Sequence, residues 1–191
     1  MGSPGSIDVK TSQKADGAHS HLWCPRLDTG PRCRVPPLRR PYFVSGHSPR
    51  SRGGSVEARE VPHKGGRTLG YRVSGGHAAL AYIPDYCPTV LGPGPDGWGE
   101  YHQAALDLAA GVDLLVHDAS LLPHEVASEA SFGHAVADYA VRLGELAGAR
   151  RVLLAHHKHD RTDEALDSLA ARFRKGPAEV MVAAEGTIFD L

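Results

Sequence analysis

The sequence predicts an α/β fold in which helices cover a layered sheet. A β-hairpin pattern comes first in the folded part, and further strand patterns then alternate with amphipathic helix patterns. This order is typical of a mixed sheet with helices packed against it. A length of 191 residues, with 41% hydrophobic and 23% charged residues, suits one globular core.

Residues 1–54 are predicted to form an irregular, basic N-terminal segment. They are rich in Ser, Gly, Pro and Arg and show no sustained helix or strand period. They hold nine Lys/Arg against three Asp/Glu, whereas the remainder of the chain holds twelve against nineteen. Such a segment could contact nucleic acid, although it lacks interleaved aromatic residues. A short apolar stretch, residues 41–44, could dock on the folded part, which we place at residues 55–191.

Three strand patterns open the folded part: residues 56–61, 68–73 and 78–83. Ser74-Gly75-Gly76-His77 separates the last two and is a hairpin turn signal. A loop rich in Pro and Gly follows over residues 88–99. Residues 100–110 then carry apolar side chains on one face, which predicts a helix that ends before Gly111.

The second half continues the alternation of strands and helices. A short apolar strand is predicted over residues 112–116 and stops at His117-Asp118. Residues 134–147 form an amphipathic helix pattern that Gly148 caps. Residues 151–155 are predicted to form a buried strand ending at His156-His157.

The closing elements are a helix and a strand. Asp160 or Thr162 can cap the N-terminus of that helix, whose first turn is acidic, as the helix dipole favours. Gly176-Pro177 ends the helix, and residues 179–184 form the last predicted strand.

Ionisable side chains follow four of the predicted strands: His63, Asp85, His117-Asp118 and His156-His157. In layered α/β sheets, side chains just past the carboxyl ends of strands line the ligand crevice. Neutral imidazole and ionised carboxylate are ligands of Zn²⁺, Mn²⁺ and Fe, so the pattern predicts a shared metal site. Each residue alone also has an ordinary interpretation, as a loop histidine, a turn aspartate or part of a polar stretch before a helix.

The cysteines and the hydropathy pattern favour a reduced, cytoplasmic protein. Three cysteines at wide spacing form neither a disulfide framework nor a Cys-x-x-Cys zinc motif. There is no run of about 18 apolar residues, so no transmembrane helix is predicted. The N-terminus also lacks the pattern of a secretory signal, and we expect no membrane contact.

An ordered series of motifs resembles the metallo-β-lactamase-fold hydrolases, in particular the tRNase Z and phosphodiesterase-like branch. His63-x₄-Thr68-Leu69-Gly70-Tyr71-Arg72-Val73 and Ala81-Tyr82-Ile83-Pro84-Asp85 are similar to the third and fourth metal motifs of that family. The other similar segments are Leu114-Leu115-Val116-His117-Asp118-Ala119, Phe132-Gly133-His134 opening a helix, Val152-Leu153-Leu154-Ala155-His156-His157, and Ala183-Ala184-Glu185-Gly186. The resemblance as a whole covers roughly residues 41–191.

The resemblance implies the C-terminal half of an αββα sandwich with a dinuclear metal site. In it, His63 would bind the first metal, His156 the second, and Asp85 would bridge both and activate a shared hydroxide. His134, at a helix N-terminus, would face the substrate phosphate or protonate the leaving oxygen. Zn²⁺ is the expected metal, with Mn²⁺ or Fe as alternatives. His157 or His159 could assist.

One family motif has no counterpart here. The His-x-His-x-Asp-His cluster should lie upstream of these motifs, but residues 1–62 contain no match. The most similar segment is His19-Ser20-His21-Leu22-Trp23-Cys24, where Trp23 and Cys24 stand in place of the Asp and His. Whether the chain is an enzyme is therefore open.

Two hypotheses follow. In the first, the chain is a metal-dependent hydrolase of small-molecule or nucleic-acid phosphodiesters. In the second, it is a truncated or degenerate non-catalytic member with at most a weak metal site. The face of the sheet that a second sheet would cover in the complete fold carries apolar residues, and a homodimer could cover that face and supply further histidines.

We predict that purified protein binds zinc sub-stoichiometrically. Three ligands leave coordination positions open on one ion and cannot hold two, so metal analysis should find one equivalent of zinc or less per chain. Two tightly bound equivalents would contradict this prediction and would require ligands beyond His63, Asp85 and His156.

Overall fold

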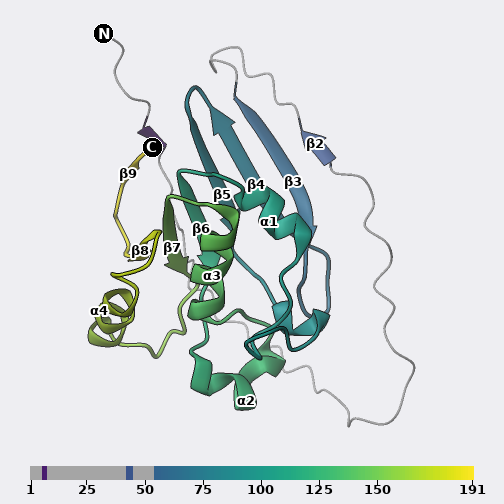
Figure 1. Cartoon of the computed structure of the whole chain (residues 1–191), viewed down its shortest axis with the longest axis vertical. Coiled ribbons are helices and arrows are strands. Elements are labelled where there is room, and N and C mark those ends of the chain that lie inside the picture. The colour runs from purple at the N-terminus through teal and green to yellow at the C-terminus, as the bar shows by residue number, and fades with distance from the viewer. Residues whose placement is uncertain (1–5, 8–41, 45–53) are drawn as a thin grey trace, which may run out of the picture.

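The computed structural model describes residues 6–7, 42–44 and 54–191. Its central element is a seven-stranded mixed sheet with strand order β2-β3-β4-β5-β6-β7-β8 (Figure 1). Strands β2 to β5 pair antiparallel, whereas β5 to β8 pair parallel. The strands are β2 (Tyr42–Val44), β3 (Ser55–Val61), β4 (Thr68–Gly75), β5 (Ala78–Ile83), β6 (Leu114–Asp118), β7 (Arg151–Ala155) and β8 (Glu179–Val182).

Helices cover one face of this sheet, which confirms the predicted α/β fold class. Helix α1 (Gln103–Ala109) contacts β3, β4 and β5, and α3 (Ala137–Ala147) contacts β6 and β7. Both lie on the viewer's side of the sheet in Figure 1. Helix α4 (Asp163–Arg172) lies beside β8. The short elements are η1 (Pro88–Leu91), η2 (Pro123–Glu125), α2 (Val126–Glu129), η3 (Ala130–Phe132), β1 (Ser6–Ile7) and β9 (Phe189–Asp190), the last two of which pair with each other.

The core forms because side chains alternate between the two faces of the central strands. On β6, Leu115 packs into the helix-side core, whereas Leu114 and Val116 belong to a second cluster on the other face. The helix-side core also contains Leu108 of α1 and Leu143 of α3, both fully buried. The parallel central strands are thus apolar on both faces, as expected for a covered sheet.

Strand direction decides where the polar strand ends meet. Strands β5, β6 and β7 are parallel, and β3 runs in the same direction because two antiparallel pairings separate it from β5. The carboxyl ends of these four strands therefore lie at one edge of the sheet. Three of the strand-end residues, His63, Asp85 and His156, follow β3, β5 and β7 at this edge.

Helix α3 begins at Ala137, so the predicted helix start at residue 134 is wrong. Gly133 has a left-handed backbone (φ 94°), and residues beyond it stay extended before the helix. The backbone of this stretch pairs with Leu121: the Leu121 amide donates to the carbonyl of Ala135, and the Ala137 amide donates to Leu121. His134 therefore precedes the helix and does not lie at its N-terminus.

Other boundaries also differ from prediction for identifiable reasons. Strand β6 continues through His117 and Asp118 because their backbones pair with β5 and β7. Helix α1 begins at Gln103, three residues after the predicted start. The cap of α4 is Thr162, whose side-chain oxygen accepts a hydrogen bond from the Ala165 amide at 3.3 Å.

The N-terminal segment lies mostly outside the described residues. The apolar stretch expected to dock on the folded part contributes β2, which pairs antiparallel with β3. The predicted irregular character of residues 1–54 stays a prediction. Within the described ranges, no helix has the length and apolar character needed to cross a membrane.

Gly144 of α3 is predicted to be required for close packing of the helix on the sheet. A methyl group at this position would clash with Cγ2 of Val152 and lie 3.3 Å from Cδ2 of Leu115. Gly144→Ala should therefore lower the free energy of unfolding by about 1–3 kcal/mol, although helix propensity alone favours Ala by about 1 kcal/mol.

Chemical denaturation tests this prediction, with Leu146→Ala as the matched control. Leu146 is 50% exposed on the same helix, so its truncation should change stability by only about 0.5 kcal/mol. A Gly144→Ala protein more stable than the parent would show that the helix–sheet distance adjusts freely.

Candidate metal centre

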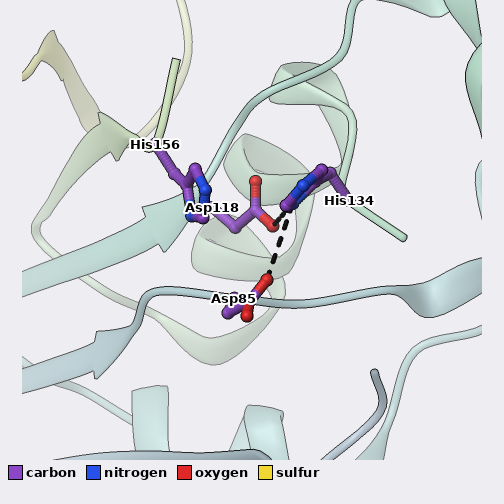
Figure 2. Close-up of side chains that lie close together, drawn as sticks. All are labelled: Asp85, Asp118, His134 and His156. Atoms are coloured by element: carbon purple, nitrogen blue, oxygen red, sulfur yellow. Dashed lines mark hydrogen bonds and ion pairs between the residues drawn. The ribbon is translucent and has the colours of Figure 1, made fainter. Parts of the chain in front are cut away.

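Two aspartates and two histidines converge at the edge of the sheet where the strands end: Asp85, Asp118, His134 and His156 (Figure 2). One ligand atom from each lies within 4.8 Å of those of the other three. They come from four separate segments: the loop after β5, the end of β6, the stretch before α3 and the residue after β7. Carboxylate and imidazole at this spacing are able to share one cation.

Asp118 is the buried member of the group. Its side chain is 0% exposed, and its carboxylate accepts hydrogen bonds from the backbone amides of Tyr86 and Ser120, each at 3.0 Å. Nδ1 of His134 lies 3.0 Å from Oδ2 of the same carboxylate. This hydrogen bond to Asp118 raises the pKa of His134, and burial of the ring opposes the shift. Asp118 thus orients the His134 ring and stabilises its protonated form.

Oδ1 of Asp85 is a buried carboxylate oxygen without a hydrogen-bond donor in the described residues. Oδ1 of Asp85 lies 3.0 Å from Nε2 of His63 and 3.6 Å from Nδ1 of His134. This oxygen is buried, yet it makes no contact with hydrogen-bond geometry within the described residues. An orphaned carboxylate oxygen facing imidazoles is the arrangement that a cation would satisfy.

His156 is held in a strained backbone conformation. Its φ of 58° is the only positive value at a non-glycine residue in the described part of the chain. Such a conformation usually costs about 1–3 kcal/mol and is found at functional sites. Nδ1 of His156 lies 2.6 Å from the carbonyl oxygen of Pro84, so Nδ1–H donates to it, and in the neutral ring Nε2 is then the nitrogen with a free lone pair. An imidazole fixed in this way is ready to bind a metal through Nε2.

The donor set therefore fits a divalent metal. It combines a buried carboxylate, an orphaned carboxylate oxygen and an imidazole of fixed tautomer. The rings of His134 and His156 are close, with centroids 4.7 Å apart. These features belong to the chain's own residues and do not depend on any relative.

The sequence-predicted residues lie as follows. Asp85, His134 and His156 are in the four-residue group, and His63 touches Asp85 from outside it. His157, a suggested helper, bonds instead to the carbonyl of Leu154 at 2.9 Å, and burial lowers its pKa. Asp118 was noted as a strand-end residue in the sequence but was not assigned as a metal ligand or catalytic residue.

The chain was compared with protein-family models and with known sequences. No family model matches the chain. In sequence it is similar to ribonuclease Z of Brevibacillus brevis, with 37% identity over 65 residues, or 34% of this chain and 20% of the relative. It is also similar to ribonuclease BN of Escherichia coli, with 29% identity over 133 residues, or 67% of this chain and 42% of the relative.

Two solved structures show the same fold. Human tRNase Z, short form, superposes with a TM-score of 0.52 at 19% identity, covering 72% of this chain and 43% of the other. The metallo-β-lactamase fold protein YhfI from Bacillus subtilis gives 0.58 at 18% identity, covering 78% and 53%. The chain spans less than half the length of the ribonucleases that it matches. The described part of the chain therefore shares part of the metallo-β-lactamase fold with these two structures.

Proposed function

We propose that this chain contributes to a metal-dependent phosphodiesterase that hydrolyses RNA. The observation that carries the proposal is the convergence of Asp85, Asp118, His134 and His156 at the carboxyl edge of the sheet. The sequence relatives are named ribonucleases, which supports RNA as the substrate class. A small-molecule phosphodiester is the alternative substrate.

In this proposal, the metal is held by Asp85 and His156, with His63 beside Asp85 as a further ligand. Oδ1 of Asp85 has no hydrogen bond and His156 has a free Nε2, so both can donate lone pairs. A bound divalent cation would act as a Lewis acid and make water nucleophilic at neutral pH. Zn²⁺ suits this mixed nitrogen and oxygen set, and Mn²⁺ and Fe are compatible with it.

His134 is proposed to protonate the leaving oxygen. Its hydrogen bond to Asp118 raises its pKa, which keeps the imidazolium populated as a proton source. As the phosphorus–oxygen bond breaks, the proton passes from His134 to the departing alkoxide. Asp118 stabilises the imidazolium before transfer and holds the ring in place. Proton donation by a general acid such as His134 typically contributes 10²- to 10⁴-fold to the rate.

The competing hypothesis is a non-catalytic module with a weak metal site. Such a module would bind metal weakly through Asp85 and His156 but would hydrolyse no phosphodiester. Because the chain spans only part of its relatives, the same experiments should be made with the chain alone and with any protein that completes the fold.

Asp85→Asn is predicted to reduce metal affinity by about 100-fold, because a neutral amide replaces the carboxylate that faces the imidazoles. Titration of metal-free protein with Co²⁺, followed by visible absorption, measures this. Asp96→Asn is the control, because Asp96 is an exposed loop carboxylate. Equal Co²⁺ affinity in the two variants would remove Asp85 from the site.

His134→Ala is predicted to affect substrates according to their leaving group. Hydrolysis of an RNA oligonucleotide, whose alkoxide needs a proton, should fall by about 10²- to 10⁴-fold. Hydrolysis of bis(p-nitrophenyl) phosphate, whose phenolate leaves without one, should change much less.

His77→Ala, in the exposed β4–β5 turn, serves as the control for this experiment. Metal content is measured in every variant. If His134→Ala loses its metal and both activities together, His134 is a ligand and not the proton donor.

A further inference from the structure

The segment that leads to His134 has little hydrophobic anchoring. It consists of η2, α2 and η3, and none of these three turns contains a buried residue. It begins after Leu122 and ends at the left-handed joint of Gly133. Val126 of α2 is partly buried against the helix-side core, but the segment contributes no fully buried side chain. Because apolar burial normally fixes a helical turn against its neighbours, polar contacts must contribute to the position of this segment.

The loop that follows His156 is similarly short of regular structure. Between the end of β7 and the start of α4 at Asp163, residues 156–162 contain only a turn. His156 stands at the first position of this loop with its positive φ. Two histidines of the candidate site are therefore carried at the ends of two segments outside the hydrophobic core.

Four charged side chains join these two segments, and we call them the charge clamp: Glu125, Glu129, Lys158 and Arg161. Nζ of Lys158 donates to both carboxylate oxygens of Glu129, at 2.9 and 2.8 Å, and lies 3.6 Å from Glu125. Nη2 of Arg161 donates to Glu125 at 2.8 Å. The clamp thus links the segment before His134 to the loop after His156 by several bonds.

The clamp also reaches the chain just beyond Asp118. Nη2 of Arg161 donates to the carbonyl of Ser120 at 3.0 Å, and the Leu122 amide donates to Glu125 at 2.7 Å. The Arg161 side chain is only 9% exposed and that of Glu125 only 14%. A networked pair at this depth is screened less by solvent than an isolated surface pair.

We propose that the charge clamp is the positioning device that sets the spacing between His134 and His156, and through it the metal affinity of the site. The inference rests on the proposed function because it treats these histidines as parts of a metal centre. The four clamp residues are not among the grouped ligand residues Asp85, Asp118, His134 and His156, and in this proposal they act only by fixing the two segments.

Charge reversal separates positioning from simple electrostatics. Lys158→Glu adds negative charge near the site, which by electrostatics alone would strengthen binding of a cation. If the clamp acts by positioning, the same variant instead places three carboxylates together, separates the segments and weakens Co²⁺ binding by about tenfold. Glu129→Lys should also weaken binding. The double variant E129K/K158E restores an ion pair at the native net charge and should recover most of the affinity.

Arg172→Glu is the matched control, because Arg172 forms an ion pair with Asp138 between α4 and α3, away from the clamp. It should leave Co²⁺ affinity within about twofold of the parent protein. Tighter Co²⁺ binding by Lys158→Glu, or no recovery in the double variant, would overturn the proposal.

Hydrogen exchange of the metal-free protein provides a second readout that does not need the proposed function to hold. The Gly133 amide bonds to the carbonyl of Ala130, and the Ala137 amide to that of Leu121. Both amides should exchange faster in Lys158→Glu and slow again in E129K/K158E. If the parent protein binds no metal, the proposed function fails, and unchanged exchange in Lys158→Glu would then reject the clamp separately.

Discussion

The buried carboxylate of Asp118 is the constraint on which the arrangement of the site depends. A charge removed from water is tolerated only when hydrogen bonds replace its hydration. Here the replacements come from the Tyr86 amide, the Ser120 amide and the His134 ring. Tyr86 directly follows Asp85, so satisfying one carboxylate also fixes the loop that carries the other. The hydrogen bonds that satisfy this one buried carboxylate thereby hold three segments of the chain together: the loop with Tyr86, the end of β6 and the stretch with His134.

Much of the fold follows from local sequence pattern, and the misplaced boundaries have a common cause. The strand runs, the hairpin and the capping of α4 by Thr162 are encoded within a few residues, where period and turn chemistry decide. The start of α3 is decided by pairing with Leu121, which is distant in sequence and competes with the helical pattern. Strand β6 extends through Asp118 for the same reason, since β5 and β7 both pair with His117 and β7 also pairs with Asp118.

Some residues of the candidate site could likewise be predicted from local sequence, whereas others could be found only in the three-dimensional structure. His63, Asp85 and His156 could be selected because each follows a strand, and strand direction alone places such residues at one edge. Asp118 also stands at a strand end, but nothing local distinguishes it from a residue that caps a loop; its burial and its donors become visible only in three dimensions. The charge clamp was beyond sequence reasoning altogether, because Glu125 and Arg161 are 36 positions apart and neither belongs to a motif.

Stability and site geometry are separable in this architecture. The hydrophobic core lies between the sheet and helices α1 and α3. His134 and His156 lie on segments outside it, where His134 follows the left-handed Gly133 and His156 itself has a left-handed backbone. Strain such as that at His156 persists only where its surroundings leave no alternative, and here the Pro84 carbonyl and the neighbouring loop supply that restraint. A sheet with an intact core can therefore keep these side chains arranged as a candidate metal site. In our proposal, the polar contacts around them, rather than the core, determine how tightly an ion is held.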